Sequence, residues 1–257
     1  MALSADLSMI WALMRRGLNE LLRVPGATIP GVLAPTIFLL GLTSVFGKLT
    51  DLSGFGTDSY MSFLIPVSLL QGAAFTGAAT GVNLARDIEQ GWFDRLLVSP
   101  APRSVLLAGM MLSASLRALL PMTVLLGVGL ALGVKFPGAG GLALSIFFVT
   151  GFAGVAAGWG STLAIHFKTQ TAAPLMQAGI FMAVLFTTSY APQELLTGWL
   201  QEVARYNPVT QIIEAVRQGF VGGEITWAGT WPGVAALAGL LALLWLLSLR
   251  EIRRATY

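Results

Sequence analysis

Residues 86–104 read R-D-I-E-Q-G-W-F-D-R-L-L-V-S-P-A-P-R-S and lie between two apolar stretches that are each long enough to cross a lipid bilayer. Within this segment Ile88, Trp92 and Leu96 recur at helical spacing, and the charged residues fall largely outside the apolar stripe. A proline-containing turn follows from Pro100, and proline ends a helix because it lacks the N–H group that the next hydrogen bond needs. The segment therefore predicts a short amphipathic helix that connects two membrane spans.

The charges of this segment point to a second protein. Asp87, Asp94 and Arg95 have no oppositely charged neighbour three or four residues away on the same helix, whereas Arg86 and Glu89 are placed to pair across one turn. We expect the unpaired charges to contact a partner. A solvated helix that lies on lipid headgroups fits these residues almost equally well.

The composition places the chain in a membrane. Of 257 residues, 55% are hydrophobic and 11% are charged, compared with roughly 25% charged residues in a typical soluble domain. We therefore expect an all-α integral membrane protein with six transmembrane helices. The predicted spans approach or exceed the roughly 20 residues that cross a bilayer: Ile29–Gly47, Tyr60–Ala85, Ser104–Val134, Ala139–Leu163, Thr171–Tyr190 and Ala228–Leu249.

Lysine and arginine set the expected orientation, because short cytoplasmic loops retain positive charge during insertion. One side of the predicted topology holds Arg15, Arg16, Arg23, Arg86, Arg95, Arg103, Lys168, Arg250, Arg253 and Arg254. The other side holds Lys48, Lys135, Arg205 and Arg217. We expect the first side, with both termini, to be cytoplasmic in a cell (plasma) inner membrane. The net charge of +3 follows from this bias and gives no reason to expect a nucleic-acid partner.

Residues 1–28 predict a helix that is retained rather than cleaved, because its positive charges follow an apolar stretch instead of preceding it. Its apolar stripe consists of Leu7, Trp11, Met14, Leu18 and Leu21. We expect this helix to lie in the inner interface of the membrane, beside the short amphipathic helix.

Residues 191–227 form the long polar connection on the predicted outer side, with two further amphipathic stripes. Asn207 is placed to cap the second helix, and Pro208 suits its first turn. We expect two short re-entrant helices that dip into the outer leaflet or cover the mouth of the bundle, the latter as a lid. Glu214 and Arg217, three residues apart, form either an exposed ion pair of little energetic consequence or a functional contact.

Arg117 lies about midway along the third predicted span, where a guanidinium costs roughly 2.5–3.5 kcal/mol on insertion scales. Pro121, one turn later, frees a backbone carbonyl. Two interpretations stay open. Arg117 is satisfied structurally by carbonyls or by snorkelling, or it faces a polar lining of the transport pathway.

Catalytic chemistry has no candidate residues. A phosphate-binding loop needs four residues between its first glycine and Gly-Lys, followed by Ser or Thr, but Gly41 is separated from Gly47-Lys48 by five residues and Leu49 follows. His166 has no second metal ligand at ligand spacing, and the chain has no cysteine. We expect neither a catalytic residue nor a cofactor or metal site in this chain. Glycine pairs at four-residue spacing predict close helix packing, at Gly77/Gly81, Gly129/Gly133 and Gly154/Gly158.

The two polar segments together resemble a known family. The inner stretch R-D-I-E-Q-G-W-F-D-R-L-L-V-S-P-A-P-R (86–103) and the outer stretches A-P-Q-E-L-L (191–196) and Y-N-P-V-T-Q-I-I-E-A-V-R-Q-G-F-V-G-G (206–223) resemble those of type-2 ATP-binding-cassette (ABC) exporter permeases. The daunorubicin-resistance-like group is the most similar. The resemblance extends over nearly the whole chain.

The resemblance implies a single transmembrane domain, residues 1–257, that dimerises with a second copy or a related permease and binds two copies of a cytoplasmic ABC ATPase. ATP and magnesium would be held by that ATPase. The domain divides into the interfacial helix (1–28), spans one and two (29–85), the coupling helix and its turn (86–103), spans three to five (104–190), the outer re-entrant helices (191–227), and span six with the basic tail (228–257). The coupling segment would use Arg86, Asp87, Glu89, Gly91, Trp92, Asp94, Arg95, Pro100 and Arg103, and the outer motif Asn207, Pro208, Glu214 and Arg217.

The implied function is ATP-driven export of hydrophobic or amphipathic, drug-like or lipid-like molecules along the seam between two permease copies. Two alternatives stay open, namely export of a lipid-linked glycan by the same architecture and a membrane scaffold that docks a partner without transport. The family pattern gives Arg117 no role.

Overall fold

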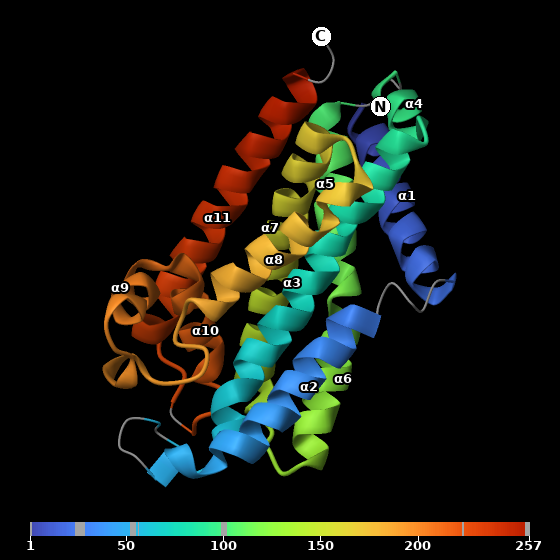
Figure 1. Cartoon of the computed structure of the whole chain (residues 1–257). Coiled ribbons are helices and arrows are strands. Elements are labelled where there is room, and N and C mark those ends of the chain that lie inside the picture. The colour runs from blue at the N-terminus through green and yellow to red at the C-terminus, as the bar shows by residue number, and fades with distance from the viewer. Residues whose placement is uncertain are drawn as a thin grey trace.

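The computed structural model describes residues 2–23, 29–51, 55, 57–98, 102–222 and 224–254. These residues form helices joined by turns, and no strand occurs among them (Figure 1). The α-helices are α1 (Ala2–Arg23), α2 (Ile29–Phe46), α3 (Tyr60–Glu89), α4 (Trp92–Leu97), α5 (Arg103–Arg117), α6 (Leu119–Ala131), α7 (Gly138–Phe167), α8 (Ala173–Leu185), α9 (Trp199–Tyr206), α10 (Pro208–Arg217) and α11 (Trp227–Arg254). Short 3-10 helices occupy Gly47–Asp51, Gln170–Ala172 and Gln193–Leu195.

Helix α3 is the centre of the bundle. Its apolar part is almost entirely buried, and it packs most extensively on α7, with α2, α8, α6 and α5 around it. The contact with α7 is close because it uses small residues. A Cβ atom added to Gly81 would lie 2.4 Å from the carbonyl oxygen of Gly160, and one added to Gly77 would lie 2.4 Å from that of Ala153. The close approach predicted for this glycine pair is thus confirmed.

Helices long and apolar enough to span a membrane match five of the predicted spans. They are Gly31–Asp51, Tyr60–Glu89, Arg103–Ala131, Gly138–Phe167 and Trp227–Arg254 among the described residues. The third is interrupted at Ala118, between α5 and α6. The interruption comes three residues before Pro121, which has no N–H group to complete the hydrogen bond one turn back.

The fifth predicted span, Thr171–Tyr190, is helical over less of its length than expected. Helix α8 has 13 residues and ends at Leu185. The hydroxyl groups of Thr187 and Ser189 each donate to the carbonyl of Val184 at 2.6 Å. Serine and threonine side chains that bond nearby carbonyls compete with the helical pattern, and this explains why the apolar run stops being a helix here.

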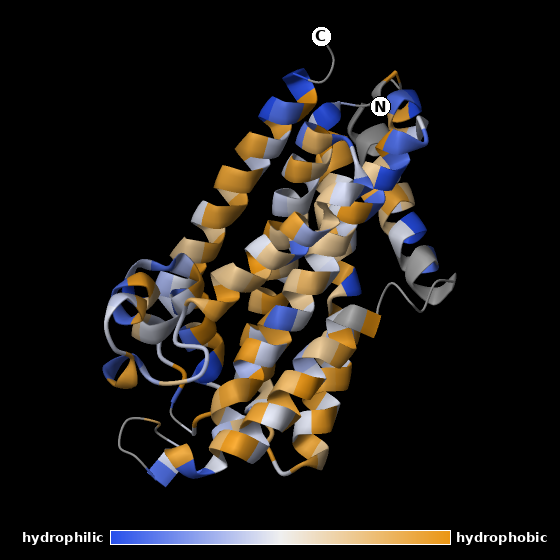
Figure 2. Ribbon diagram, in the orientation of Figure 1, coloured by the Kyte–Doolittle hydropathy of each residue, from blue (hydrophilic) through white to orange (hydrophobic). Residues whose placement is uncertain are grey.

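The polar residues gather at two places along the bundle, with mostly hydrophobic helices between them (Figure 2). The first, which we call the α4 end, contains α4, the last turn of α3, the start of α1 and the last turn of α11. The second, the α10 side, contains α9, α10 and the segment that joins α8 to them, toward the other end of the bundle. The start of α1 and the end of α11 therefore lie at the same end.

Candidate functional site

The predicted amphipathic helix is shorter than expected. Helix α3 continues to Glu89, and the chain then turns at Gly91, whose φ of 69° lies in the left-handed region that favours glycine. Helix α4 begins only at Trp92. The expectation of one helix carrying Ile88 and Trp92 on a shared stripe is therefore wrong, because the break at Gly91 places them on different helices.

Helix α4 is held by packing on one side and is open on the other. Phe93 is buried in a cluster with Leu84 of α3, and with Leu107 and Met111 of α5. Asp94 and Arg95 are exposed, and neither side chain has an ion-pair or hydrogen-bond partner among the described residues. The expectation that these two charges are available to a partner is consistent with this geometry.

Asp87 already has a partner within the chain. A terminal nitrogen of Arg16 on α1 donates to its two carboxylate oxygens at 3.0 and 2.9 Å. The Arg16 guanidinium also lies 3.8 Å from the centre of the Trp92 ring, a cation–π contact. One arginine thus joins α1 to the last turn of α3 and to the first residue of α4. The expected proximity of α1 and the short helix is confirmed, but Asp87 is not a free charge.

Helix α1 contacts the bundle through residues outside the predicted stripe. It packs along α5 through Leu13 and Gly17, which face Gly109 and Ser113. Trp11, which belongs to the predicted stripe, is 60% exposed. Leu7, Leu18 and Leu21 lie outside the residues whose side chains the structure describes.

The other charges at the α4 end also have partners. Glu89 accepts hydrogen bonds from the hydroxyl of Thr169 and from the backbone and side-chain amides of Gln170, at 2.5–2.8 Å. The Arg86 side chain donates to the amide oxygen of Gln170 at 3.3 Å. Both residues therefore hold the loop between α7 and α8, rather than each other. Arg103 is the first residue of α5, and Pro100 lies outside the described residues.

Arg117 is buried and donates to the Thr80 hydroxyl at 2.5 Å. It lies at the edge of a cavity of about 70 Å³ between α1, α3, α4 and α5, whose lining also includes Arg16, Asp87 and Trp92. Such a volume holds a few water molecules rather than a drug-sized molecule. Arg117 is therefore held against α3 by its hydrogen bond to Thr80, beside this small cavity. A role of Arg117 in the transport pathway stays a prediction.

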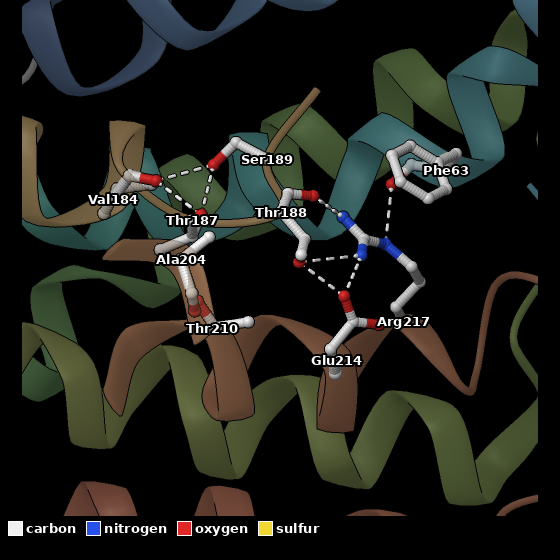
Figure 3. A network of polar contacts seen from close by, with 9 residues as sticks. All are labelled: Phe63, Val184, Thr187, Thr188, Ser189, Ala204, Thr210, Glu214 and Arg217. Atoms are coloured by element: carbon white, nitrogen blue, oxygen red, sulfur yellow. Dashed lines mark hydrogen bonds and ion pairs between the residues drawn. The ribbon is translucent and has the colours of Figure 1, made fainter. Parts of the chain in front are cut away.

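A second polar network lies on the α10 side (Figure 3). Arg217 is 5% exposed and forms an ion pair with Glu214. Its remaining nitrogens donate to the carbonyls of Thr188, at 2.7 Å, and Phe63, at 3.2 Å, and its guanidinium lies 3.8 Å over the Phe63 ring. The Thr188 hydroxyl donates to the Glu214 carboxylate. The interpretation of an exposed ion pair is wrong for Arg217, because α10 is buried against α11, α3 and α7.

Asn207 joins α8 to α10. Its side-chain oxygen accepts from the backbone N–H of Val209, so the predicted cap is confirmed, and Pro208 is the first residue of α10. Its side-chain nitrogen donates to the carbonyls of Ala183 and Phe186 at 2.8 Å. The sequence pattern predicted the cap but gave no signal for these two contacts with the end of α8.

The two amphipathic stripes on the α10 side differ in burial. The second stripe is buried, at Val209, Ile212, Ile213, Val216 and Phe220. The first stripe, on and before α9, remains largely exposed, at Leu195, Trp199 and Val203. Only α10 is thus embedded among the long helices.

Comparisons with known proteins agree with this arrangement. The family model described as "ABC-2 type transporter" matches residues 8–221. The chain is 29% identical to the daunorubicin resistance ABC transporter permease protein DrrB1 of Streptomyces coeruleorubidus, over 98% of this chain and 87% of the relative. It is 29% identical to the probable doxorubicin resistance ABC transporter permease protein DrrC of Mycobacterium tuberculosis (strain ATCC 25618 / H37Rv), over 83% of this chain and 75% of the relative.

A third relative, the probable multidrug ABC transporter permease YbhR of Escherichia coli (strain K12), is 29% identical over 67% of this chain and 48% of that protein. The family match includes the end of α3, α4 and α10, which are the elements that hold both polar networks. The long apolar helices and this match together make the chain a multi-pass membrane protein, and it belongs to the ABC-2 type transporter family of permeases.

Proposed function

We propose that the chain is the membrane-spanning subunit of an ATP-driven exporter of hydrophobic or amphipathic molecules, with the α4 end facing the cytoplasm. A separate ABC ATPase docks on α4 and supplies the energy. Two copies of the permease, or this chain and a related one, enclose the pathway and bind two ATPase subunits. The names of the relatives, which refer to daunorubicin, doxorubicin and multidrug transport, favour drug-like cargo.

The observation that carries this proposal is the way in which α4 is held. Phe93 anchors one face of α4 among residues of α3 and α5, while Asp94 and Arg95 present opposite charges to solvent on the other face. A partner that binds those charges can therefore displace α3 and α5 together. A contact that differs between two states of the partner is what coupling between the ATPase and the membrane spans requires.

On this proposal the remaining elements have defined places. The outer segment, including the short α8 and helices α9 and α10, enters the outer leaflet as a re-entrant unit and completes a six-span arrangement. The exposed apolar faces of the bundle contact lipid and the second copy.

The test is reconstitution of the full chain in proteoliposomes with the ATPase that co-purifies with it. We expect a hydrophobic dye such as rhodamine 6G to be moved only when both proteins and ATP are present. We also expect the dye to raise the rate of ATP hydrolysis. Association of the two proteins without movement of the dye or of any lipid, and without a change in ATP hydrolysis, would favour a scaffold. Movement of a lipid-linked glycan instead of the dye would favour the glycan exporter.

A further inference from the structure

The last turn of α3 holds the loop between α7 and α8. Glu89 accepts hydrogen bonds from the Thr169 hydroxyl and from the backbone N–H of Gln170, both at 2.8 Å. Its second carboxylate oxygen accepts from the Gln170 side-chain amide at 2.5 Å. Arg86, one turn earlier, donates to the oxygen of that amide at 3.3 Å. Both ends of the Gln170 amide group are therefore bonded to α3.

This loop determines where α8 begins. Helix α7 ends at Phe167, and Lys168 follows with a φ of 56°, in the left-handed region that ends a right-handed helix. Thr169 then caps the 3-10 helix Gln170–Ala172, which leads directly into α8. Because the backbone leaves helical geometry at Lys168, α7 does not set the direction of α8. The hydrogen bonds of the loop to Glu89 set it instead.

The packing of α8 on α3 leaves a further freedom that these bonds remove. Helix α8 packs chiefly on α3 and buries Met176, Ile180 and Val184. Apolar contacts are non-directional, so packed helices can slide past each other by small amounts. The Trp159 ring N–H donates to the Met176 carbonyl at 3.1 Å, but this bond joins α8 to α7. The bonds of Glu89 are directional and join α8 to α3, so they fix its position along that helix.

The other end of α8 is joined to the α10 side. The Asn207 side chain donates to the carbonyls of Ala183 and Phe186, both at 2.8 Å, and it also caps α10. Helix α8 thus extends from the α4 end to the α10 side and is bonded to another element at each end (Figure 1). A displacement of the last turn of α3 can therefore reach α10 through α8.

We propose that Glu89 is a positioning residue for export, which fastens α8 to the end of α3 that the ATPase moves. Helices α3, α4 and α8 then move as one unit, and the movement reaches α10. This role rests on the proposed function, because the movement begins with an ATPase that docks on α4. Glu89 acts within the permease on this proposal, in place of the ATPase contact that the family resemblance implied.

The first test compares Glu89→Ala and Gln170→Leu, singly and together, in proteoliposomes that contain the ATPase. Alanine is a good helix former, so the last turn of α3 is retained. The matched control is Glu202→Ala, which removes an exposed carboxylate of α9. Three quantities are measured, namely the movement of rhodamine 6G, the rate of ATP hydrolysis and the amount of ATPase that co-purifies.

We expect Glu89→Ala to lower the amount of dye moved per ATP roughly threefold to tenfold, at the lower end of typical coupling effects because the carboxylate is exposed. Gln170→Leu should have a smaller effect, and the double variant should equal Glu89→Ala, because both changes remove one contact. Co-purification of the ATPase should be unchanged, and Glu202→Ala should behave like the parent. Unchanged dye movement per ATP in Glu89→Ala would overturn the proposal. Reduced co-purification would do so too, because it would place Glu89 on the ATPase contact.

A reversible link separates positioning from local structure. The chain has no cysteine, so Glu89→Cys/Gln170→Cys can be joined selectively by a short, reducible bis-methanethiosulfonate reagent. We expect the unlinked pair to lose coupling as Glu89→Ala does, the link to restore most of it, and a reductant to abolish the restoration. A linked protein that hydrolyses ATP but moves no dye would overturn the proposal, because the contact would then have to open during transport.

Failure of the exporter assignment is distinguishable from failure of the contact. If the parent chain moves no dye with its ATPase and ATP, the proposed function fails, and the role of Glu89 in export fails with it. Hydrogen exchange of residues 168–175, measured by mass spectrometry on the full chain in nanodiscs without the ATPase, tests the contact alone. We expect faster exchange in Glu89→Ala than in the parent. Equal exchange would show that Glu89 does not hold the loop, whatever the parent transports.

Discussion

Arg16 and Asp87 join the N-terminal helix to the central helix, through hydrogen bonds from one guanidinium nitrogen to both carboxylate oxygens at 3.0 and 2.9 Å. The two residues are 71 positions apart in the chain. Their side chains are 44% and 19% exposed, so solvent screens the pair and its contribution to stability is small. Because the same guanidinium stacks on Trp92, the pair fixes where α4 leaves α3. We therefore expect the pair to affect coupling between the ATPase and the membrane helices more than the free energy of unfolding.

Replacement of this pair tests that expectation. Arg16→Ala and Asp87→Asn should each lower cargo-stimulated ATP hydrolysis while shifting the free energy of unfolding by at most about 1 kcal/mol. The double variant should be no worse than the stronger single variant, because both remove one contact. Arg15→Ala is the matched control, since Arg15 is an exposed neighbour. Additive losses in the double variant would show that the two side chains act separately.

The exposed charges of α4 give a test of ATPase docking. Asp94→Lys/Arg95→Glu exchanges the two charges without changing the net charge, and neither side chain has a partner to lose among the residues described. We expect co-purification of the ATPase to fall at least tenfold. After the exchange, each charge on α4 faces a charge of the same sign on a partner that complements the original pattern, and like charges repel. The corresponding exchange on α9, Glu202→Lys/Arg205→Glu, should leave co-purification unchanged. An ATPase that still binds the α4 variant would exclude this pair from the docking surface.

Gly91 provides a test of the break between α3 and α4. A Cβ atom there would meet no atom within 4 Å, so Gly91→Ala acts only through the backbone, whose φ of 69° is unfavourable for alanine. We expect a loss of about 1 kcal/mol in the free energy of unfolding, measured in detergent by thermal or denaturant unfolding. Gly41→Ala on α2 also has free space but no positive φ, and it should be neutral or slightly stabilising. Equal effects at the two positions would contradict the left-handed turn.

The long helices were predictable from sequence because each buries or exposes a continuous apolar surface. The start of α2 at Ile29 and of α3 at Tyr60 agrees with the predicted spans, and the Asn207 cap agrees because capping is a local pattern. The length of α8 was not predictable from hydropathy, since Phe186 and the residues after it are compatible with a span. The helix ends where two hydroxyl groups donate to the Val184 carbonyl, and such contacts are not visible in a hydropathy profile.

The candidate site was predictable only in part, for a similar reason. A short helix between two spans was predicted, and Asp94 and Arg95 are exposed as expected, but the spacing of Ile88 and Trp92 gave no sign of the break at Gly91. The partner of Asp87 was not predictable, because Arg16 belongs to a different helix far away in the chain. The burial of Arg217 was likewise missed, since an i, i+3 ion pair is compatible with an exposed or a buried helix.

That buried arginine gives the largest expected effect on stability. Arg217→Met keeps most of the side-chain volume but removes the cation that pairs with Glu214 and the N–H groups that donate to the carbonyls of Phe63 and Thr188. Breaking a buried ion pair costs roughly 3–5 kcal/mol, and the partial exposure of Glu214 places the expected loss toward the lower end of that range. Unfolding in detergent, followed by the intensity of the helical circular dichroism signal, measures it.

Two further variants separate the ion pair from the volume of the side chain. Arg205→Met removes an exposed arginine of α9 and should change the free energy of unfolding by less than about 0.5 kcal/mol. Glu214→Gln/Arg217→Met should be less destabilised than Arg217→Met alone, because the neutral amide no longer leaves a charge without its partner. If the double variant is instead as unstable as the sum of the two single changes, the carbonyl contacts of Arg217 carry the stability, and the ion pair with Glu214 does not.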